Sequence, residues 1–196
     1  MVLNHSIMVR NEKHEILKFL IGHNSLSYTI RELSILRKIN YKSAYEAIKK
    51  LENENSITLT KKGNTVLCQF KRKFNESVYL AEKSRLDELL KKKHFRTIKE
   101  ELTEVKFPFI ALVFGSYAKN KQTKNSDIDL LLISEHPKEI EQKLHWIPLD
   151  LHITSLTFND FLEMLNRKSF DVVSETLKNN IILHGIEDYY RFLENV

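Results

Sequence analysis

The chain has 196 residues, of which 42% are hydrophobic and 29% are charged. This composition is typical of a soluble globular protein and argues against wholesale disorder. No apolar run approaches the roughly 20 residues that a membrane-spanning helix needs, so we expect no membrane partner. The single cysteine, Cys68, excludes an intramolecular disulfide bond and fits a reducing cytosol, so we expect a cytoplasmic protein.

Charge is distributed unevenly along the chain, whose formal net charge is +5. Residues 1–75 hold 14 Lys and Arg against 6 Asp and Glu, a net charge of +8, whereas the remainder holds 17 against 20, a net charge of −3. A basic part joined to a mildly acidic part indicates two domains, and the basic one suits a polyanionic partner. A solvated lysine-rich surface explains the same charge, and charge alone does not decide between the two.

Residues 1–74 carry three helical patterns followed by two strand patterns. The first helix has an apolar stripe over residues 16–21, and the second begins at the capping-box sequence Thr29–Glu32. The third helix has its apolar face over residues 44–51. The strands are expected at residues 57–60 and 66–70, with Lys61-Lys62-Gly63-Asn64 as the turn between them.

Over residues 29–70 this layout resembles a winged helix-turn-helix. Asn55 stands where glycine would be usual and tolerates the same left-handed backbone. The resemblance implies that the third helix enters a DNA major groove while the wing contacts phosphate. The candidate DNA-binding residues are Lys42, Ser43, Lys49, Lys61 and Lys62. A winged helix used only for protein contact or dimerisation is the alternative, and a homodimer is compatible with it.

Residues 75–94 have a highly charged helical pattern, which we interpret as a connector. It would join an N-terminal domain at residues 1–74 to a C-terminal domain at residues 95–196. Only 4 glycines and 3 prolines occur in the chain, so a long flexible linker is not expected.

The segment with a chemical pattern lies between residues 107 and 134. The apolar run FPFIALVF predicts a buried strand that ends at Gly115-Ser116, and a second apolar strand opens with Asp127 and Asp129 after a short helix. Gly115 lets a phosphate approach the backbone, and Ser116 adds a hydroxyl donor beside the helix N–H groups. Two aspartates two residues apart on a strand project to one face, where their hard oxygen ligands suit Mg²⁺. Each pair alone is a weak signal, since strand-end aspartates also cap helices or solubilise surfaces.

The pattern Gly-Ser-x10-Asp-x-Asp, set between apolar strands, resembles the DNA polymerase β-like nucleotidyltransferase superfamily. It looks closest to the minimal nucleotidyltransferases, a branch that includes antitoxin partners of HEPN-type toxins. The resemblance implies an α+β chain whose C-terminal domain has a small mixed sheet flanked by helices. It also implies a third carboxylate on a later strand, for which Asp150 is the candidate and an ordinary strand-edge carboxylate the alternative. His152 shares a strand face with Asp150 and either lines the site or satisfies a local hydrogen bond, and Asn120 stands where the family often has glycine.

The resemblance further implies an enzyme that transfers a nucleoside monophosphate, AMP from ATP in the leading case, to a hydroxyl acceptor. Gly115 and Ser116 would bind the nucleotide, and the catalytic residues Asp127, Asp129 and Asp150 would bind two Mg²⁺ ions, with Mn²⁺ as a substitute. The acceptor would be a small molecule or a protein such as a HEPN-type toxin. Two alternatives stay open, namely a transcriptional regulator that senses nucleotide without turnover and a transferase that modifies RNA or tRNA.

Overall fold

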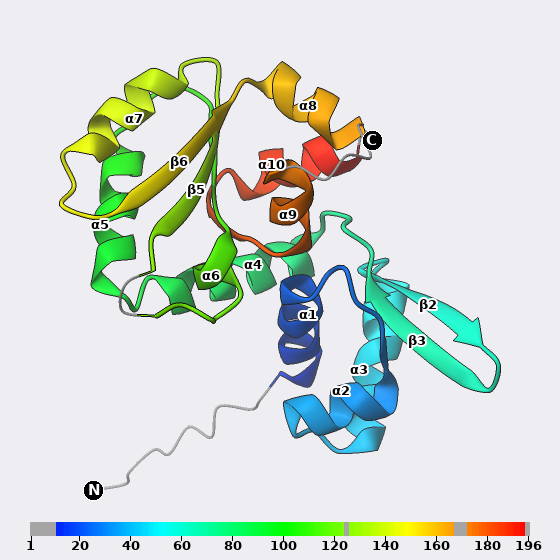
Figure 1. The fold of residues 1–196 in the computed structure, drawn as a ribbon. Coiled ribbons are helices and arrows are strands. Elements are labelled where there is room, and N and C mark those ends of the chain that lie inside the picture. The colour runs from blue at the N-terminus through cyan, green and yellow to red at the C-terminus, as the bar shows by residue number, and fades with distance from the viewer. Residues whose placement is uncertain (1–10, 124–125, 167–171, 195–196) are drawn as a thin grey trace, which may run out of the picture.

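The computed structural model describes residues 11–123, 126–166 and 172–194, which form two sheets and the helices packed against them (Figure 1). The first sheet belongs to the N-terminal part and has the strand order β1-β3-β2, with both pairs antiparallel. The elements of this part are α1 (Glu12–Gly22), β1 (Tyr28–Thr29), α2 (Ile30–Arg37), α3 (Tyr41–Asn53), β2 (Ile57–Lys62) and β3 (Thr65–Phe70). The hairpin of β2 and β3 projects away from the rest of the molecule (Figure 1).

The helix ends of the N-terminal part form as the sequence predicts. Thr29 Oγ1 accepts a hydrogen bond from the backbone N–H of Glu32 at 3.1 Å, and Glu32 Oε2 accepts one from the N–H of Thr29 at 2.7 Å. This reciprocal pair is the expected capping box. Asn55, with φ of +59°, adopts the expected left-handed conformation after α3. The short strand β1 was not expected, because two residues are too few to show an alternating pattern.

The second sheet belongs to the C-terminal part and has the order β6-β5-β4-β7. Strand β4 pairs antiparallel with β5 and with β7, whereas β5 and β6 are parallel, so the sheet is mixed, as expected. The elements of this part are α4 (Glu76–Leu89), α5 (Lys93–Thr103), β4 (Ile110–Val113), α6 (Gly115–Ala118), β5 (Ile128–Ile133), α7 (Pro137–His145), β6 (Leu151–Leu156), α8 (Phe158–Asn166), α9 (Val172–Lys178), β7 (Ile181–His184) and α10 (Ile186–Glu194). None of the helices in the described part of the chain is both long and apolar enough to cross a membrane.

Helices cover both faces of the C-terminal sheet, as the alternation along β5 requires. Leu131 and Ile133 belong to a buried cluster with α8, α9 and α10, whereas Leu130 and Leu132 belong to a second cluster with α5 and α7. Successive side chains of a strand point to opposite faces. Asp129 therefore lies on the same face of β5 as Leu131, near the start of the strand.

Three local features differ from the sequence prediction. Strand β4 begins at Ile110 rather than at Phe107, and Pro108, which has no N–H to donate to the ladder, lies just before it. Strand β6 begins at Leu151, so the apolar stretch before Asp150 is not strand. Helix α7, which carries the parallel crossover from β5 to β6, was not predicted.

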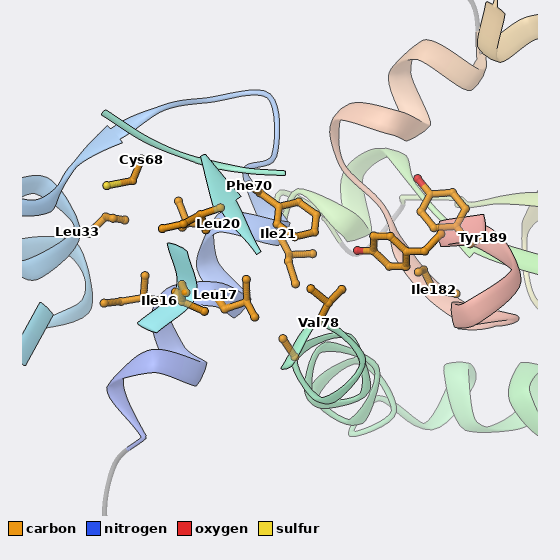
Figure 2. Packing of buried hydrophobic residues seen from close by; sticks show 14 of the residues in the cluster. Ile16, Leu17, Leu20, Ile21, Leu33, Cys68, Phe70, Val78, Ile182 and Tyr189 are labelled. Atoms are coloured by element: carbon orange, nitrogen blue, oxygen red, sulfur yellow. The ribbon is translucent and has the colours of Figure 1, made fainter. Parts of the chain in front are cut away.

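Helix α4 packs against both parts of the chain and forms the joint between them. Its residue Val78 shares a buried cluster with α1 and with β7, and Figure 2 shows Leu17, Ile21, Val78 and Ile182 in that cluster. One continuous apolar core therefore runs from the N-terminal part into the C-terminal sheet.

A buried polar network accompanies this core at the joint. Arg85 donates to Glu82 Oε2 at 2.7 Å and to the backbone carbonyl of Asn180. The hydroxyl of Tyr190 donates to Glu82 Oε1 at 2.7 Å, and Asn180 Nδ2 donates to the hydroxyl of Tyr189 at 2.8 Å. Glu82 is only 2% exposed and Arg85 8%, so each charge depends on these partners. The network ties α4 to α10 and to the start of β7.

Candidate active site

Strand β4 ends in a turn with a backbone conformation that favours glycine. Phe114 is extended, and its backbone N–H donates to the carbonyl oxygen of Asp129 at 3.1 Å. Gly115 has φ of +66° and begins the short helix α6. A residue with a Cβ atom is strained at such a φ. The turn therefore places the start of α6 beside the N-terminal end of β5.

The carboxylate of Asp129 packs directly on Gly115. A Cβ atom built on residue 115 would lie 2.0 Å from Oδ2 of Asp129 and 2.9 Å from its Cγ. The Asp129 side chain is 25% exposed, so part of the carboxylate faces solvent. Position 115 therefore requires glycine for two reasons: its positive φ, and the Asp129 carboxylate in the space that a side chain would need.

The other two candidate carboxylates lie at the same edge of the sheet. Asp127 immediately precedes β5, Asp150 immediately precedes β6, and both are exposed. The backbone N–H of Ile128 donates to the carbonyl oxygen of Asp150 at 3.0 Å, which fixes the two strand starts side by side. Strand alternation and parallel pairing assign the three aspartates to one face. Within the described residues, however, no three Asp, Glu, His or Cys side chains come together as a group that could hold a metal ion.

His152 contacts Asp129 across the pair of parallel strands. The two residues are in register, and Nδ1 of His152 lies 3.2 Å from Oδ1 of Asp129. One carboxylate oxygen of Asp129 therefore faces His152 while the other faces Gly115. The histidine side chain is 70% exposed, so water weakens this pair.

The residues after the turn close it on its far side. The backbone N–H of Lys121 donates to the carbonyl oxygen of Ser116 at 2.9 Å. Asn120 has φ of +52°, the left-handed conformation that its position in the pattern requires. Lys119 Nζ lies 2.7 Å from Glu175 Oε1 and so connects this loop with α9. The loop at residues 119–121 therefore contacts both the turn and α9, and neither contact involves Asp127, Asp129 or Asp150.

The candidate DNA-binding residues differ in how they are placed. Lys42, Lys61 and Lys62 are exposed, the first near the start of α3 and the others at the end of β2. Lys49 is paired with Glu52 at 2.8 Å, a hydrogen bond that raises the pKa of the lysine above its ordinary value. Ser43 is half-buried and takes part in the capping of α3 by Asn40, so its hydroxyl already has a partner at 3.0 Å.

The comparison with protein families bears on the segment that carries the turn and the carboxylates. Residues 96–188 match the family model described as Polymerase beta, Nucleotidyltransferase. This match supports a nucleotidyltransferase domain. The matched segment contains the Gly115 turn and all three candidate carboxylates, so the nucleotidyltransferase superfamily expected from their spacing is supported at this general level. No curated protein and no solved structure matches the chain.

Two contacts at the sheet edge could not be predicted from the spacing of residues in the sequence. The pattern Gly-Ser-x10-Asp-x-Asp predicts that the two aspartates lie near Gly115. It does not show that Asp129, rather than Asp127, packs on the glycine. The register between β5 and β6 pairs Asp129 with His152, and a single sequence does not contain that register. The alternation of residues 150–153 supplied the one available signal, since it put His152 on the face of Asp150.

Proposed function

We propose that the nucleotidyltransferase domain transfers a nucleoside monophosphate, AMP from ATP in the leading case, to a hydroxyl acceptor with release of pyrophosphate. The observation that carries this proposal is the contact between Asp129 and Gly115, so close that a Cβ atom on residue 115 would lie 2.0 Å from the carboxylate oxygen. It joins a turn open to phosphate and an acidic side chain at one point of the sheet edge. The family match over residues 96–188 supports the same reaction class.

The donor set fits a hard divalent cation. Asp127 and Asp129 supply carboxylate oxygens from one strand, and Asp150 starts the neighbouring strand. Mg²⁺ in nucleotide sites uses one or two carboxylates together with substrate phosphates and water, so the protein need not supply a complete cage. We propose that Asp127 and Asp129 hold two such ions with the triphosphate, Asp150 completes one of the two sites, and Mn²⁺ can replace Mg²⁺. When bound, the metal lowers the pKa of the acceptor hydroxyl and neutralises charge on the leaving pyrophosphate.

The residues of the chain supply position and orientation. Gly115 has no side chain, which makes room for the Asp129 carboxylate, and we propose that its backbone N–H and the Ser116 hydroxyl donate to phosphate oxygens. Nδ1 of His152 lies 3.2 Å from Oδ1 of Asp129, on the side of the carboxylate away from Gly115. Phosphoryl-transfer sites of this kind work mostly by positioning and electrostatics, so an error in the placement of one carboxylate lowers the rate directly.

For the acceptor we propose a protein hydroxyl, on the resemblance to antitoxins that act on HEPN-type toxins. In that role the chain would modify its partner and silence it. A small-molecule hydroxyl is the other acceptor of the same chemistry.

We further propose that residues 1–74 form a winged helix that binds DNA, with residues 75–94 as the connector and residues 95–196 as the transferase domain. The order of three helices and the β1-β3-β2 sheet supports this proposal. So do the exposed lysines Lys42, Lys61 and Lys62, because phosphate contacts need unpaired cations. Ser43 and Lys49 have protein partners and would contribute less.

The experiment incubates the full chain with ATP labelled at the α-phosphate, Mg²⁺, and three acceptor pools: the chain itself, copurifying protein, and RNA. Label transferred to protein and lost in the Asp129→Asn variant supports the proposal. Asp87→Asn is the matched control, because Asp87 is an exposed aspartate of α4 outside the site. Specific DNA binding with no transfer to any pool would instead make the chain a nucleotide-sensing regulator, and transfer to RNA would make it an RNA or tRNA transferase.

A further inference from the structure

A second site of a different kind lies between the two parts of the molecule. A cavity of about 280 Å³ is enclosed by α1, the C-terminal half of α4, the end of α6 and the segment before β7. In Figure 1 these elements meet in the middle of the molecule. Its volume is just below the range of about 300–1,000 Å³ that is usual for small-molecule sites, so it suits only a small ligand. None of the five candidate transferase residues lines it.

The lining is strongly basic. Among the described residues that line the cavity, Glu88 is the single acidic one, and the lining residues come from both parts of the chain. The basic lining residues are Lys18, His23, Arg37, Arg85, Lys92 and Lys119. A concave surface with this excess of cations concentrates anions.

Carboxylates in or next to the wall pair with the basic residues on the side formed by α1 and α4. Glu15 lies 3.1 Å from Lys18 and 2.8 Å from Arg37, and Lys18 also lies 2.7 Å from Glu88. Arg85 is held by the buried Glu82. These pairs fix the side of the cavity formed by α1 and α4 before any ligand arrives.

Two lysines on the opposite side are better placed to meet a ligand. Lys92 is half-buried, makes no ion pair within the described residues, and has its Nζ 4.9 Å from the centre of the Tyr117 ring. Burial lowers the pKa of Lys92 below its ordinary value. Within the described residues, Lys119 forms an ion pair with the exposed Glu175, and exposed pairs of this kind contribute little.

The rest of the wall suits an organic group better than a bare ion. Phe19 and His23 are stacked with ring centres 4.2 Å apart. Nδ1 of His23 lies 2.9 Å from the carbonyl oxygen of Phe19, which can only accept, so Nδ1 carries the proton and Nε2 is the nitrogen that can meet a ligand. Asn179 also lines the cavity, and its side-chain oxygen is buried without a hydrogen-bond partner in the described structure.

We propose that this cavity binds a small phosphate ester of mononucleotide size, with the phosphate at Lys92 and Lys119 and the organic part against Phe19 and His23. The site is separate from the proposed transfer site and does not depend on it. Because its walls belong to both parts of the chain, an occupied cavity links the basic N-terminal part to the loop that follows the Gly115 turn. The ligand would therefore act as an effector of the joint between them.

The experiment measures AMP binding to the full chain by calorimetry in excess EDTA, a condition that removes the divalent ions a transferase site needs. AMP binds the unmodified chain, and the Lys92→Ala and Lys119→Ala variants each weaken binding by about tenfold or more, since hydrogen bonds from charged donors to phosphate are strong. The Lys91→Ala variant is the matched control, because Lys91 is exposed and does not line the cavity, and it leaves binding within about twofold. The thermal unfolding midpoint of each variant shows that it is folded.

Further binding measurements distinguish this cavity from the proposed transfer site and from a site that binds any small anion. The Asp129→Asn and Ser116→Ala variants keep AMP binding, while adenosine and inorganic phosphate each bind more weakly than AMP. The proposal is overturned if AMP does not bind in EDTA, if Lys92→Ala and Lys91→Ala behave alike, or if Ser116→Ala is the variant that loses AMP. Inorganic phosphate that binds as tightly as AMP would contradict the assignment of an organic ligand. A chain that fails to transfer nucleotide but binds AMP this way leaves the inference intact.

Discussion

Charged side chains are buried and paired at the joint around α4, whereas they are exposed or partly exposed at the sheet edge near Gly115. At the joint, Glu82 and Arg85 are almost fully buried, and each has protein partners within hydrogen-bond distance. At the sheet edge, Asp127 and Asp150 are exposed, and Asp129 has one exposed histidine beside it. Charges satisfied inside the protein hold its shape, whereas charges left at an edge are available to a ligand.

We expect the largest effect from removing the buried ion pair between Arg85 and Glu82 at the joint. Arg85→Ala leaves the buried carboxylate of Glu82 without its cation, and loss of one partner of a buried pair costs about 3–5 kcal/mol. Denaturant unfolding measures the change. Arg96→Ala removes the same side chain from an exposed helix position and should leave the free energy of unfolding nearly unchanged. Equal effects of the two variants would contradict the role given to the network.

A substitution at the turn should cost activity in addition to the stability lost through backbone strain. Gly115→Ala places a Cβ atom 2.0 Å from the Asp129 carboxylate, so that side chain must move. We expect nucleotide transfer to fall by about 100-fold or more, because small displacements of positioned groups have effects of this size. Gly63→Ala is the control, since Gly63 has φ of +60° but nothing within 4 Å of its Cβ position. It shares the backbone strain and should keep full activity.

The stability of the C-terminal part should depend on pH through His184. The ring of His184 stacks on the ring of Phe109 with their centres 4.0 Å apart. Burial, and to a smaller extent the positive charge of Lys99, lowers the pKa of His184 below the ordinary value of about 6.5. The folded state therefore favours the neutral ring. Its contribution is present above pH 6.5 and is lost as pH falls below that value.

Thermal unfolding between about pH 7 and pH 5 tests this dependence, in a window that follows from the ordinary histidine pKa. The His184→Phe variant should show a flatter loss of stability on acidification than the unmodified chain. His14 and His94, whose pKa values burial also lowers, should leave some dependence. An unchanged slope in the variant would show that His184 is not responsible.

The smallest effects should come from single lysines of the N-terminal part. Lys61 and Lys62 are exposed, whereas Lys49 is paired with Glu52. If the wing contacts DNA, each wing lysine changed to alanine should lower the salt dependence of binding by about one unit of slope. Lys49→Ala should change it less. Fluorescence anisotropy of a labelled duplex at several salt concentrations distinguishes these results.

Local rules in the sequence predicted the elements that depend on neighbouring residues. The capping box at Thr29–Glu32 and the left-handed residue at Asn55 are both present, because each is set by interactions within a few positions. The family match covers the segment in which the spacing of Gly115, Asp127 and Asp129 had indicated a nucleotidyltransferase. Helix α7 was missed although its apolar residues Ile140 and Leu144 lie at helical spacing behind a proline.

Contacts between distant segments could not be predicted in the same way. The pairing of Glu82 with Tyr190 spans more than a hundred residues, and nothing near either residue indicates the other. The contact of Asp129 with His152 depends on the register of two parallel strands, which a single sequence does not fix. The cavity beside Lys92 exists only because α1 packs on α4, so it too follows from tertiary packing.

We propose that Asp129, packed on Gly115, holds a divalent metal together with a nucleotide. Electron paramagnetic resonance of Mn²⁺ tests it without knowledge of the acceptor, using a non-hydrolysable ATP analogue and the full chain. We predict nucleotide-dependent Mn²⁺ binding that Asp129→Asn abolishes and Asp87→Asn preserves. Binding of equal strength in both variants would contradict the account.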